Sequence, residues 1–599
     1  MIKRFVPAVV ILAVACGGGG GDITPPPVVK LSDISSMSVG EVRVLNPTDI
    51  PNGIDLPAGS GARDYIIVVG NTSPQHDVVA NYTVKADRSA TGVFALEAAA
   101  DFAAQSSLQL TQVPLARMPQ QAVENRVRSF ERSGLTLKSP SGLLGSPRFN
   151  ARRSALAATV SVPTLGQVVN VNVPNAAPGK DLCNDFFQTQ AVVASVSQKA
   201  ILMVDTLDGP PLSLFTQAGM DSITAEFDAT TYPADAAYFN TPTDIDGNGR
   251  IIMLLTGQIN LLTPAGSPAA NGFVAGFFFA GDFFPATGTS FGDHCAETNL
   301  AEIFYLLSPD PTGAKFGNIR SANSVRQGTR GTIAHEFQHM INAGNRYFSP
   351  DPAVTNFEST WLDEALSHFA EDAVGRQAVG MTDLQTFTSS NLPTCNTPCQ
   401  QANDFNAFFY QNFARLSYWM DKPDQFSPIS NLADTSLAVR GAAWALVRYA
   451  ADNYANGLPR TLMHQLSIGP DTGVKNFTAA TKAPIDTLVK GWLVSMYADH
   501  LGITGLDPKY QYRSYDFRSA MPPVAKFVLN QSVATYPLRI QYIGNGSDNI
   551  SAKNLSGTGS YFRLTVAAGA AAKNVKILDA SGTTAASFTG EHIYVLRVQ

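Results

Sequence analysis

Histidine and long apolar runs are both scarce in this chain, and charge of neither sign dominates. Only 8 of the 599 residues are histidine, so a metal-binding spacing of histidines should rarely arise by chance. The 42 basic and 48 acidic residues give a net charge of −6, which indicates no nucleic-acid or anionic lipid partner. The N-terminal apolar run, residues 5–15, is too short to span a membrane. At this length we expect several domains.

The first residues have the features of an export signal. A basic pair and the apolar run precede small residues, Cys16 and a glycine tract. Residues 12–16 resemble a bacterial lipobox, in which the cysteine is lipidated, although Ala13 stands where leucine is usual. We therefore expect a lipoprotein signal peptide at 1–15 and a Gly/Pro tether at 16–31. The protein would then be exported to the bacterial outer membrane or cell surface. Its only attachment to the membrane would be a lipid on Cys16, unless the protein is released from the cell.

Cysteine is rare beyond this point, with only four further residues. An even number in an exported chain favours disulfides. Cys395 and Cys399 would close a small loop, which leaves Cys183 to pair with Cys295. A cysteine-rich zinc site is the alternative, but the exported context and the spacing favour disulfides.

β-rich patterns lie at both ends of the chain. Residues 32–115 and 506–599 contain alternating and β-branched runs separated by Gly, Asn, Ser and Pro turns, which predict N- and C-terminal β-sandwich-like domains. Residues 116–164 predict a linker, with an amphipathic helix at 118–134 and then a basic, Ser/Gly/Pro-rich stretch. That stretch is either a plain linker or a proteolytic processing site.

The long middle region, residues 165–505, changes to a mixed α/β pattern. Residues 199–205, 251–255 and 302–307 predict buried strands, and residues 212–227 predict a helix. The strand at 302–307 is a candidate to pair with an extended substrate backbone.

A polar loop precedes the second of these strands. Its pattern D-x-D-x-N-G offers Asp244, Asp246 and Asn248 as oxygen ligands, as in the first half of a calcium loop. Leu255 stands where an EF-hand has its bidentate acid, so the loop is not an EF-hand. A weaker Ca²⁺ site and a simple polar turn both remain open.

A serine motif also occurs in this region. G-x-S-x-G, centred on Ser290, matches the nucleophile elbow of serine hydrolases. The elbow needs a strand directly before it and a helix directly after it, and neither pattern is present. A glycine-rich loop is therefore favoured over a serine hydrolase.

The most specific motif is H-E-x-x-H, at His335, Glu336 and His339. Apolar residues around it recur at helical spacing, with Thr332 as a start cap and Gly344 as a stop signal. Residues four apart lie on one helix face, so the two imidazoles would meet at one point and suit Zn²⁺. Glu336 beside them is placed to act as general base.

A catalytic zinc needs a third protein ligand. The metzincin extension fails, because Asn342 and Asn345 occupy its Gly and His positions. A second predicted helix, ending at Gly375, carries Glu364, which would supply the ligand from across the first helix.

These motifs together resemble the gluzincins, zinc peptidases whose third ligand is a glutamate in an N-E-x-x-S-D-like helix. Asp363 stands at the asparagine position of that pattern. Within the gluzincins, the chain is similar to the hyicolysin-like peptidases over about residues 165–505. The similar stretches are residues 244–249, 301–305, 334–342 and 361–367. The resemblance implies an α+β zinc peptidase domain with Zn²⁺ on His335, His339 and Glu364.

The sequence departs from the family pattern at two places. His368 stands where an acid usually orients a zinc-binding histidine, and Glu371 or Asp372 are alternatives for that task. His368 as a replacement ligand is a further alternative. The family's usual oxyanion donor is also not evident. Candidates for that donor are Arg440, Tyr449, Tyr454 and His464.

The sequence therefore predicts an exported zinc metalloendopeptidase that acts on proteins or peptides. The rival hypothesis is a surface adhesion or binding protein, built of β modules around a catalytically silent zinc domain. An intact H-E-x-x-H with a third glutamate favours the peptidase.

Overall fold

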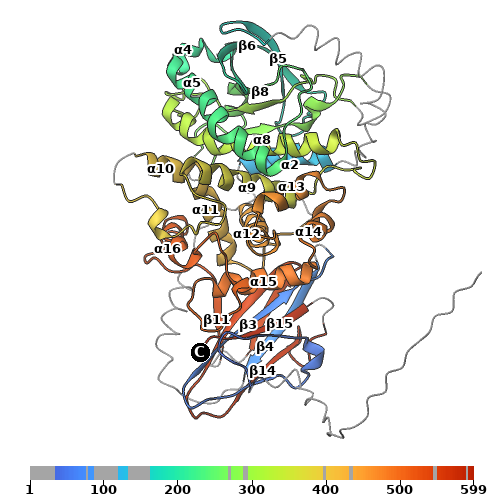
Figure 1. The fold of residues 1–599 in the computed structure, drawn as a ribbon, viewed down its shortest axis with the longest axis vertical. Helices are drawn as coiled ribbons and strands as arrows, with labels where there is room; N and C mark the ends of the chain where they lie inside the picture. The colour runs from blue at the N-terminus through green and yellow to red at the C-terminus, as the bar shows by residue number, and fades with distance from the viewer. Residues whose placement is uncertain are drawn as a thin grey trace, which may run out of the picture.

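The computed structural model describes most of the chain from residue 34 onward. The described residues are 34, 36–75, 78–86, 119–132, 162–267, 272–287, 294–395, 399–430, 436–543, 549–587 and 591–599. The predicted signal peptide, tether and Cys16 lie outside them, as do Ser290 and the basic stretch of the linker. The protein is multidomain and α+β, with a sheet at one end, helices in the middle and further sheets at the other end (Figure 1).

A six-stranded sheet forms one end of the molecule, in the order β5-β6-β7-β8-β10-β9. β7, β8 and β10 are parallel and fully buried, as their continuous apolar sequences predict. β9 runs antiparallel to β10 and forms the edge of the sheet. The strand bounds are β5 Val168–Pro174, β6 Phe186–Val196, β7 Ala200–Asp205, β8 Ile251–Leu255, β9 Gly276–Phe278 and β10 Ile303–Leu306.

The connections of this sheet are mostly short helices. The helix predicted at 212–227 is present, as α4 and α5 with a one-residue gap between the end of the first and the cap of the second. The elements are η3 Thr206–Asp208, α4 Pro211–Leu214, α5 Gln217–Glu226, η4 Phe227–Thr231, α6 Tyr232–Phe239, α7 Gly257–Asn260 and η6 Ala280–Phe283.

A helical layer lies below the sheet, with α8 and α9 packed against each other at its top (Figure 1). None of the described helices is both long and apolar enough to cross a membrane. The helices are α8 Ala322–Tyr347, α9 Thr360–Ala378, η7 Ser389–Asn391, α10 Gln400–Asp404, η8 Phe405–Phe409, α11 Tyr410–Asp421, α12 Leu437–Tyr454, α13 Pro459–Ile468, α14 Gly473–Thr481, α15 Ile485–Ala498 and η9 Pro508–Tyr510.

The helix that carries H-E-x-x-H is longer than its sequence signals predict. Ser321, not Thr332, caps α8: its Oγ accepts a hydrogen bond from the Ser324 amide at 3.1 Å. The Thr332 hydroxyl instead donates to the Gly328 carbonyl within the helix. Gly344, predicted to stop the helix, also lies inside it.

Glycines in α8 and α9 allow close packing rather than ending the helices. A Cβ on Gly331 would lie 2.1 Å from the Ala407 carbonyl oxygen, and one on Gly375 would lie 2.6 Å from the Phe408 Cβ. Both contacts are to residues of η8, so η8 packs closely against the backbones of α8 and α9 at these glycines. A larger side chain at either glycine would push η8 away from the helices that carry His335, His339 and Glu364.

The strands from the two ends of the chain form one body, here called the terminal β unit. One sheet has the order β1-β15-β3-β13-β11 and the other β12-β4-β14-β2. Their apolar residues share a core that includes Ile67, Tyr82 and Val595. The strands are β1 Val42–Leu45, β2 Ile54–Leu56, β3 Arg63–Asn71, β4 Val79–Ala86, β11 Ile540–Tyr542, β12 Asn549–Leu555, β13 Thr558–Val566, β14 Lys573–Asp579 and β15 Glu591–Arg597; the short helix η1 Pro47–Asp49 lies between the first two.

The terminal β unit differs from the two separate flanking domains expected at 32–115 and 506–599. β3 lies between β13 and β15, so neither end of the chain completes a sheet alone. Strand alternation shows which face of a strand is buried, but it does not show which strand pairs with which. The second region also contains helices before its strands: η9 is followed by α16 Phe517–Val528, which Asp516 caps by accepting a hydrogen bond from the Ser519 amide.

One strand connects the terminal β unit to the helical layer. In β3, Ile67 and Val69 face the core of the unit, while Ile66 and Val68 belong to the large core that contains the helices. The Tyr561 hydroxyl of β13 donates to the Leu493 carbonyl of α15 at 2.8 Å. The unit is thus packed against the rest of the protein.

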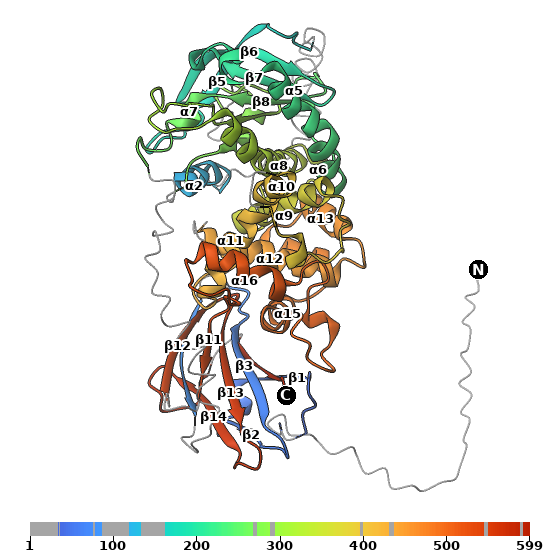
Figure 2. The same ribbon diagram turned by 90° about the vertical axis from the view of Figure 1, so that its left-hand side faces the viewer.

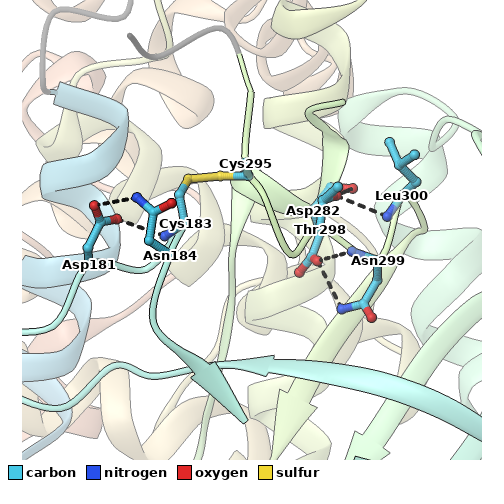
Figure 3. The surroundings of a disulfide bond; sticks show 8 residues. All are labelled: Asp181, Cys183, Asn184, Asp282, Cys295, Thr298, Asn299 and Leu300. Atoms are coloured by element: carbon cyan, nitrogen blue, oxygen red, sulfur yellow. Dashed lines mark hydrogen bonds between the residues drawn. A yellow bond between two sulfur atoms is a disulfide. The ribbon is translucent and has the colours of Figure 1, made fainter. Parts of the chain in front are cut away.

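Both predicted disulfides are present, and the longer-range one joins distant parts of the chain. Cys183, between β5 and β6, is bonded to Cys295, beyond β9 (Figure 3). The second bond joins Cys395 to Cys399.

Removing the longer disulfide should destabilise the protein more than removing the shorter one. The sequence separations are 112 and 4 residues. Because the entropy of loop closure grows with the logarithm of loop length, the paired substitution Cys183→Ser/Cys295→Ser should lower the free energy of unfolding by about 3 kcal/mol more than Cys395→Ser/Cys399→Ser. Chemical denaturation under non-reducing conditions measures the difference, and equal losses would contradict the prediction.

Candidate metal centre

Two crossed helices bring the three predicted ligands together. His335 and His339 lie one turn apart on α8, with their Nε2 atoms 3.1 Å from each other. Glu364 projects from α9, and its Oε2 lies 3.5 Å from the His335 Nε2. The other oxygen, Oε1, lies 3.9 Å from the His339 Nε2. One donor atom from each residue lies within 4.8 Å of the others, which is the spacing of a shared metal ion.

The donor set fits a metal ion better than an apolar or purely hydrogen-bonded core. Glu364 is 1% exposed, yet neither of its carboxylate oxygens accepts a hydrogen bond from the described residues. A buried carboxylate without hydrogen bonds is costly. Two guanidinium groups compensate its charge in part, with the Arg440 Nη2 3.3 Å and the Arg128 Nε 3.7 Å from Oε1, and a metal ion shared with the histidines would compensate it further. Two imidazoles and one carboxylate are a ligand set typical of catalytic zinc.

The other ring nitrogens of the two histidines are held by acids and a serine. The His335 Nδ1 lies 2.9 Å from Glu371 Oε1. The His339 Nδ1 lies 2.8 Å from Asp363 Oδ2 and 3.0 Å from the Ser367 hydroxyl. Acids in these positions fix the ring orientation and leave each Nε2 free to bind a metal.

Of the alternatives for the histidine-orienting acid, Glu371 occupies that position and Asp372 does not. Asp372 faces the opposite side of α9, where it pairs with Arg376 and Arg448. His368 lies beside both Glu371 and His335: its Nδ1 is 3.0 Å from the Glu371 Oε1, and the three residues also lie close enough to share a metal ion. His368 as a replacement ligand stays a prediction. Burial opposes the charged form of Glu371, but His368 and then Arg415 outweigh it and hold its pKa below its usual range.

Neutralising Glu371 should weaken zinc binding without removing a ligand. Glu371→Gln keeps the size of the side chain but loses the negative charge that faces His335, so we expect zinc affinity to fall by about 10- to 100-fold. Competition against a chelator of known affinity measures the change. An unchanged affinity in a folded variant would contradict this role.

Glu336 faces the same site but contacts the edge strand of the sheet. Its Oε2 accepts a hydrogen bond from the Phe278 amide of β9 at 2.8 Å. Burial raises the pKa of Glu336 to about 7, although His335 and Arg128 oppose the shift. A carboxyl with a pKa near neutrality is well matched to exchanging protons at that pH.

A cavity of about 210 Å³ opens beside His335 and Glu336. Of the four predicted oxyanion donors, Arg440 lines it. Its Nη2 lies 3.3 Å from Glu364 Oε1. The other three lie elsewhere among the described residues: Tyr449 donates to the Lys509 carbonyl, Tyr454 packs on Tyr449, and His464 is on α13.

A helix from the predicted linker reaches this cavity. α2 Pro119–Arg132 confirms the helix expected at 118–134, and its Gln120, Gln121 and Glu124 line the cavity. Figure 2 shows it beside α8, between the sheet and the helices below. Its polar, amphipathic pattern predicted a helix within a linker. Nothing in the sequence of α2 indicated contact with a site some 200 residues further along the chain.

In the structure, an acidic residue from outside the motif lies beside the polar loop that precedes β8. Asp244, Asp246 and Glu302 lie close enough to share a metal ion. Backbone amides of the loop already bond to some of these oxygens: the Asn248 Oδ1 accepts a hydrogen bond from the Arg250 amide, and a Glu302 carboxylate oxygen accepts one from the Ile245 amide. Calcium binding there stays a prediction.

The sequence is distantly similar to a known metalloprotease. No family model matches the chain. Over 150 residues, 25% of this chain, it is 25% identical to the neutral metalloprotease ShpI of Staphylococcus hyicus, and the match spans 30% of that protein's length. The similarity supports a metalloprotease relationship over part of the chain, in line with the cluster of side chains on α8 and α9 that could hold a metal ion.

Proposed function

We propose that this chain is a zinc metalloendopeptidase of the gluzincin type. One observation carries the proposal: His335, His339 and the buried Glu364 lie close enough to share a metal ion. Of these three, His335 also lines the cavity, together with Glu336. The distant similarity to a metalloprotease supports it. The cofactor would be Zn²⁺, held by His335, His339 and Glu364, and the substrate would be a protein or peptide.

The chain's own residues account for the proton transfers of peptide hydrolysis. Zinc in this site would supply Lewis-acid chemistry, which acidifies water and polarises a carbonyl. Glu336 would accept the proton of the attacking water and deliver it to the leaving amine. The Phe278 amide, 2.8 Å from the Glu336 Oε2, orients the carboxylate for both steps.

Arg440 is the side chain we assign to the developing oxyanion. Its guanidinium is buried at the cavity, where its Nη2 forms ion pairs with Glu124 and with Glu364. A permanently charged donor at a dry site stabilises negative charge strongly.

The strand that would pair with substrate is β9 rather than the one expected at 302–307. That stretch forms β10, which is bonded on both sides, to β8 and to β9. β9 is the edge of the sheet, so its outer side can add an extended peptide.

Digestion of casein and of a peptide library tests this function. The zinc-loaded protein should cleave internal peptide bonds, lose this activity with a zinc chelator and regain it when zinc is restored. A protein that binds zinc but cleaves no peptide, even after the N-terminal linker is cut, would favour the rival binding function. Export and lipidation at Cys16 remain part of the proposal, and mass spectrometry of the mature N-terminus tests them.

A further inference from the structure

We infer that α2 is an internal inhibitor, which occupies the substrate groove of the proposed peptidase until it is displaced or excised. This regulation rests on the function proposed above. Three sets of contacts carry it: hydrogen bonds to β9, ion pairs at the metal centre, and an apolar face that docks the helix.

The first contacts occupy the strand edge that a substrate would use. The Gln120 Nε2 donates to the Gly276 carbonyl at 3.0 Å, and its Oε1 accepts from the Ala275 amide at 2.8 Å. The side-chain amide of Gln120 thus takes up one donor and one acceptor of the backbone at the start of β9, groups with which an added peptide strand would pair. A substrate cannot pair with these groups while Gln120 holds them.

The second contacts involve charged groups of the metal centre. Glu124 forms an ion pair with Arg440, the proposed oxyanion donor. Arg128 lies 3.5 Å from Asp363 and its Nε lies 3.7 Å from Glu364. These pairs are buried, so they are weakly screened by water and hold the helix in one orientation.

The third contacts fix α2 to the body of the protein. Val123 and Val127 are at most 1% exposed, and Phe130 packs on Phe279 and Phe284 with ring centroids 4.9 and 5.6 Å apart. Arg126 also donates to the Ala176 carbonyl at 2.6 Å.

The docked helix leaves too little room for a peptide. Glu336 and Glu364 are 2% and 1% exposed, and the cavity of about 210 Å³ is smaller than the roughly 300–1,000 Å³ of sites for small ligands. Since Gln120, Gln121 and Glu124 form one wall of the cavity, moving α2 would open the groove along β9.

The fold allows α2 to be removed while the rest of the chain stays together. α2 lies between β4 and β5, and the strands before it pair with strands after residue 540 in both sheets of the terminal β unit. Cuts on the two sides of α2 would therefore leave β1–β4 bound to the body, and would release only the intervening segment.

The test uses the full chain with recognition sites for a specific protease inserted within residues 87–118 and 133–161. The probe is a fluorescent peptide hydroxamate, whose binding to the zinc-loaded Glu336→Gln protein is followed by anisotropy. After cutting, we expect the dissociation constant of the probe to fall by at least about tenfold. A change of this size means that α2 leaves the groove open in less than about a tenth of the uncut molecules. A synthetic peptide of residues 119–132 should reverse the gain.

A second variant tests the inference without removing α2, because excision of the helix could unfold the protein. In the uncut protein, Gln120→Ala/Glu124→Ala should also tighten probe binding, whereas Ser129→Ala, on the exposed side of α2, should not. Equal probe binding before and after cutting, and in the double variant, would overturn the inference.

Hydrolysis assays on the same preparations without the Glu336 substitution separate this inference from the peptidase function. Tighter probe binding without any peptide cleavage would leave α2 as the occupant of the groove and reject the peptidase. Cleavage that is already maximal before cutting, with unchanged probe binding, would retain the peptidase and reject the inhibitor.

Discussion

Glu336→Gln should lower peptide hydrolysis by about 10²- to 10⁴-fold while zinc content and folding stay unchanged. The glutamine amide oxygen can still accept the hydrogen bond from Phe278, so the position of the side chain is preserved. What is lost is the group that takes and returns a proton. Initial rates on a fluorogenic peptide, with zinc measured by mass spectrometry, give both quantities.

The control for this substitution is the same Glu→Gln change at a position far from the cavity. Glu41, in the terminal β unit next to Arg43, serves this purpose. Glu41→Gln should leave the rate unchanged. Full activity in Glu336→Gln would contradict the proposed mechanism, because no other described carboxylate is both free of a metal-ligand role and hydrogen-bonded to the edge strand beside the cavity.

Glu364→Gln should abolish activity by a different route, through loss of the metal. Residues that merely orient zinc ligands contribute about 10- to 100-fold to zinc affinity, so removal of a direct ligand should cost more than 100-fold. The change also leaves Arg128 and Arg440 without the negative charge that they face. Zinc affinity is measured by chelator competition.

The order of effects distinguishes the two roles in the site. Zinc affinity should fall most in Glu364→Gln, less in Glu371→Gln and not at all in Glu336→Gln, whereas hydrolysis should be lost in both Glu364→Gln and Glu336→Gln. A zinc affinity in Glu364→Gln equal to that of the unsubstituted protein would remove Glu364 from the ligand set.

The local part of the site could be predicted from sequence because it depends on helical spacing. His335 and His339 lie on one face of any helix that contains them, and Glu364 was identified by the pattern of a second helix. The structure brings these three together. Glu371 was one of two alternatives. Asp372 points away from the histidines because it pairs with Arg376 and Arg448. Residue spacing alone does not show where these two arginines lie.

Non-local pairing explains what sequence patterns missed. Alternation indicated strands at both ends of the chain, but β3 pairs with β13 and β15 some 500 residues away. In the same way, a buried strand at 302–307 was recognisable, but only the sheet order shows that β9 has the free edge. The docking of α2 depends on Gln120, Glu124 and Arg128 meeting partners that are remote in sequence.

Anomalous diffraction at the zinc edge, from crystals grown with zinc, tests the central claim most directly. We predict one strong peak at about 2.0–2.2 Å from the Nε2 atoms of His335 and His339 and from a carboxylate oxygen of Glu364. A zinc-saturated crystal with no peak between these three residues would contradict the proposed metal centre.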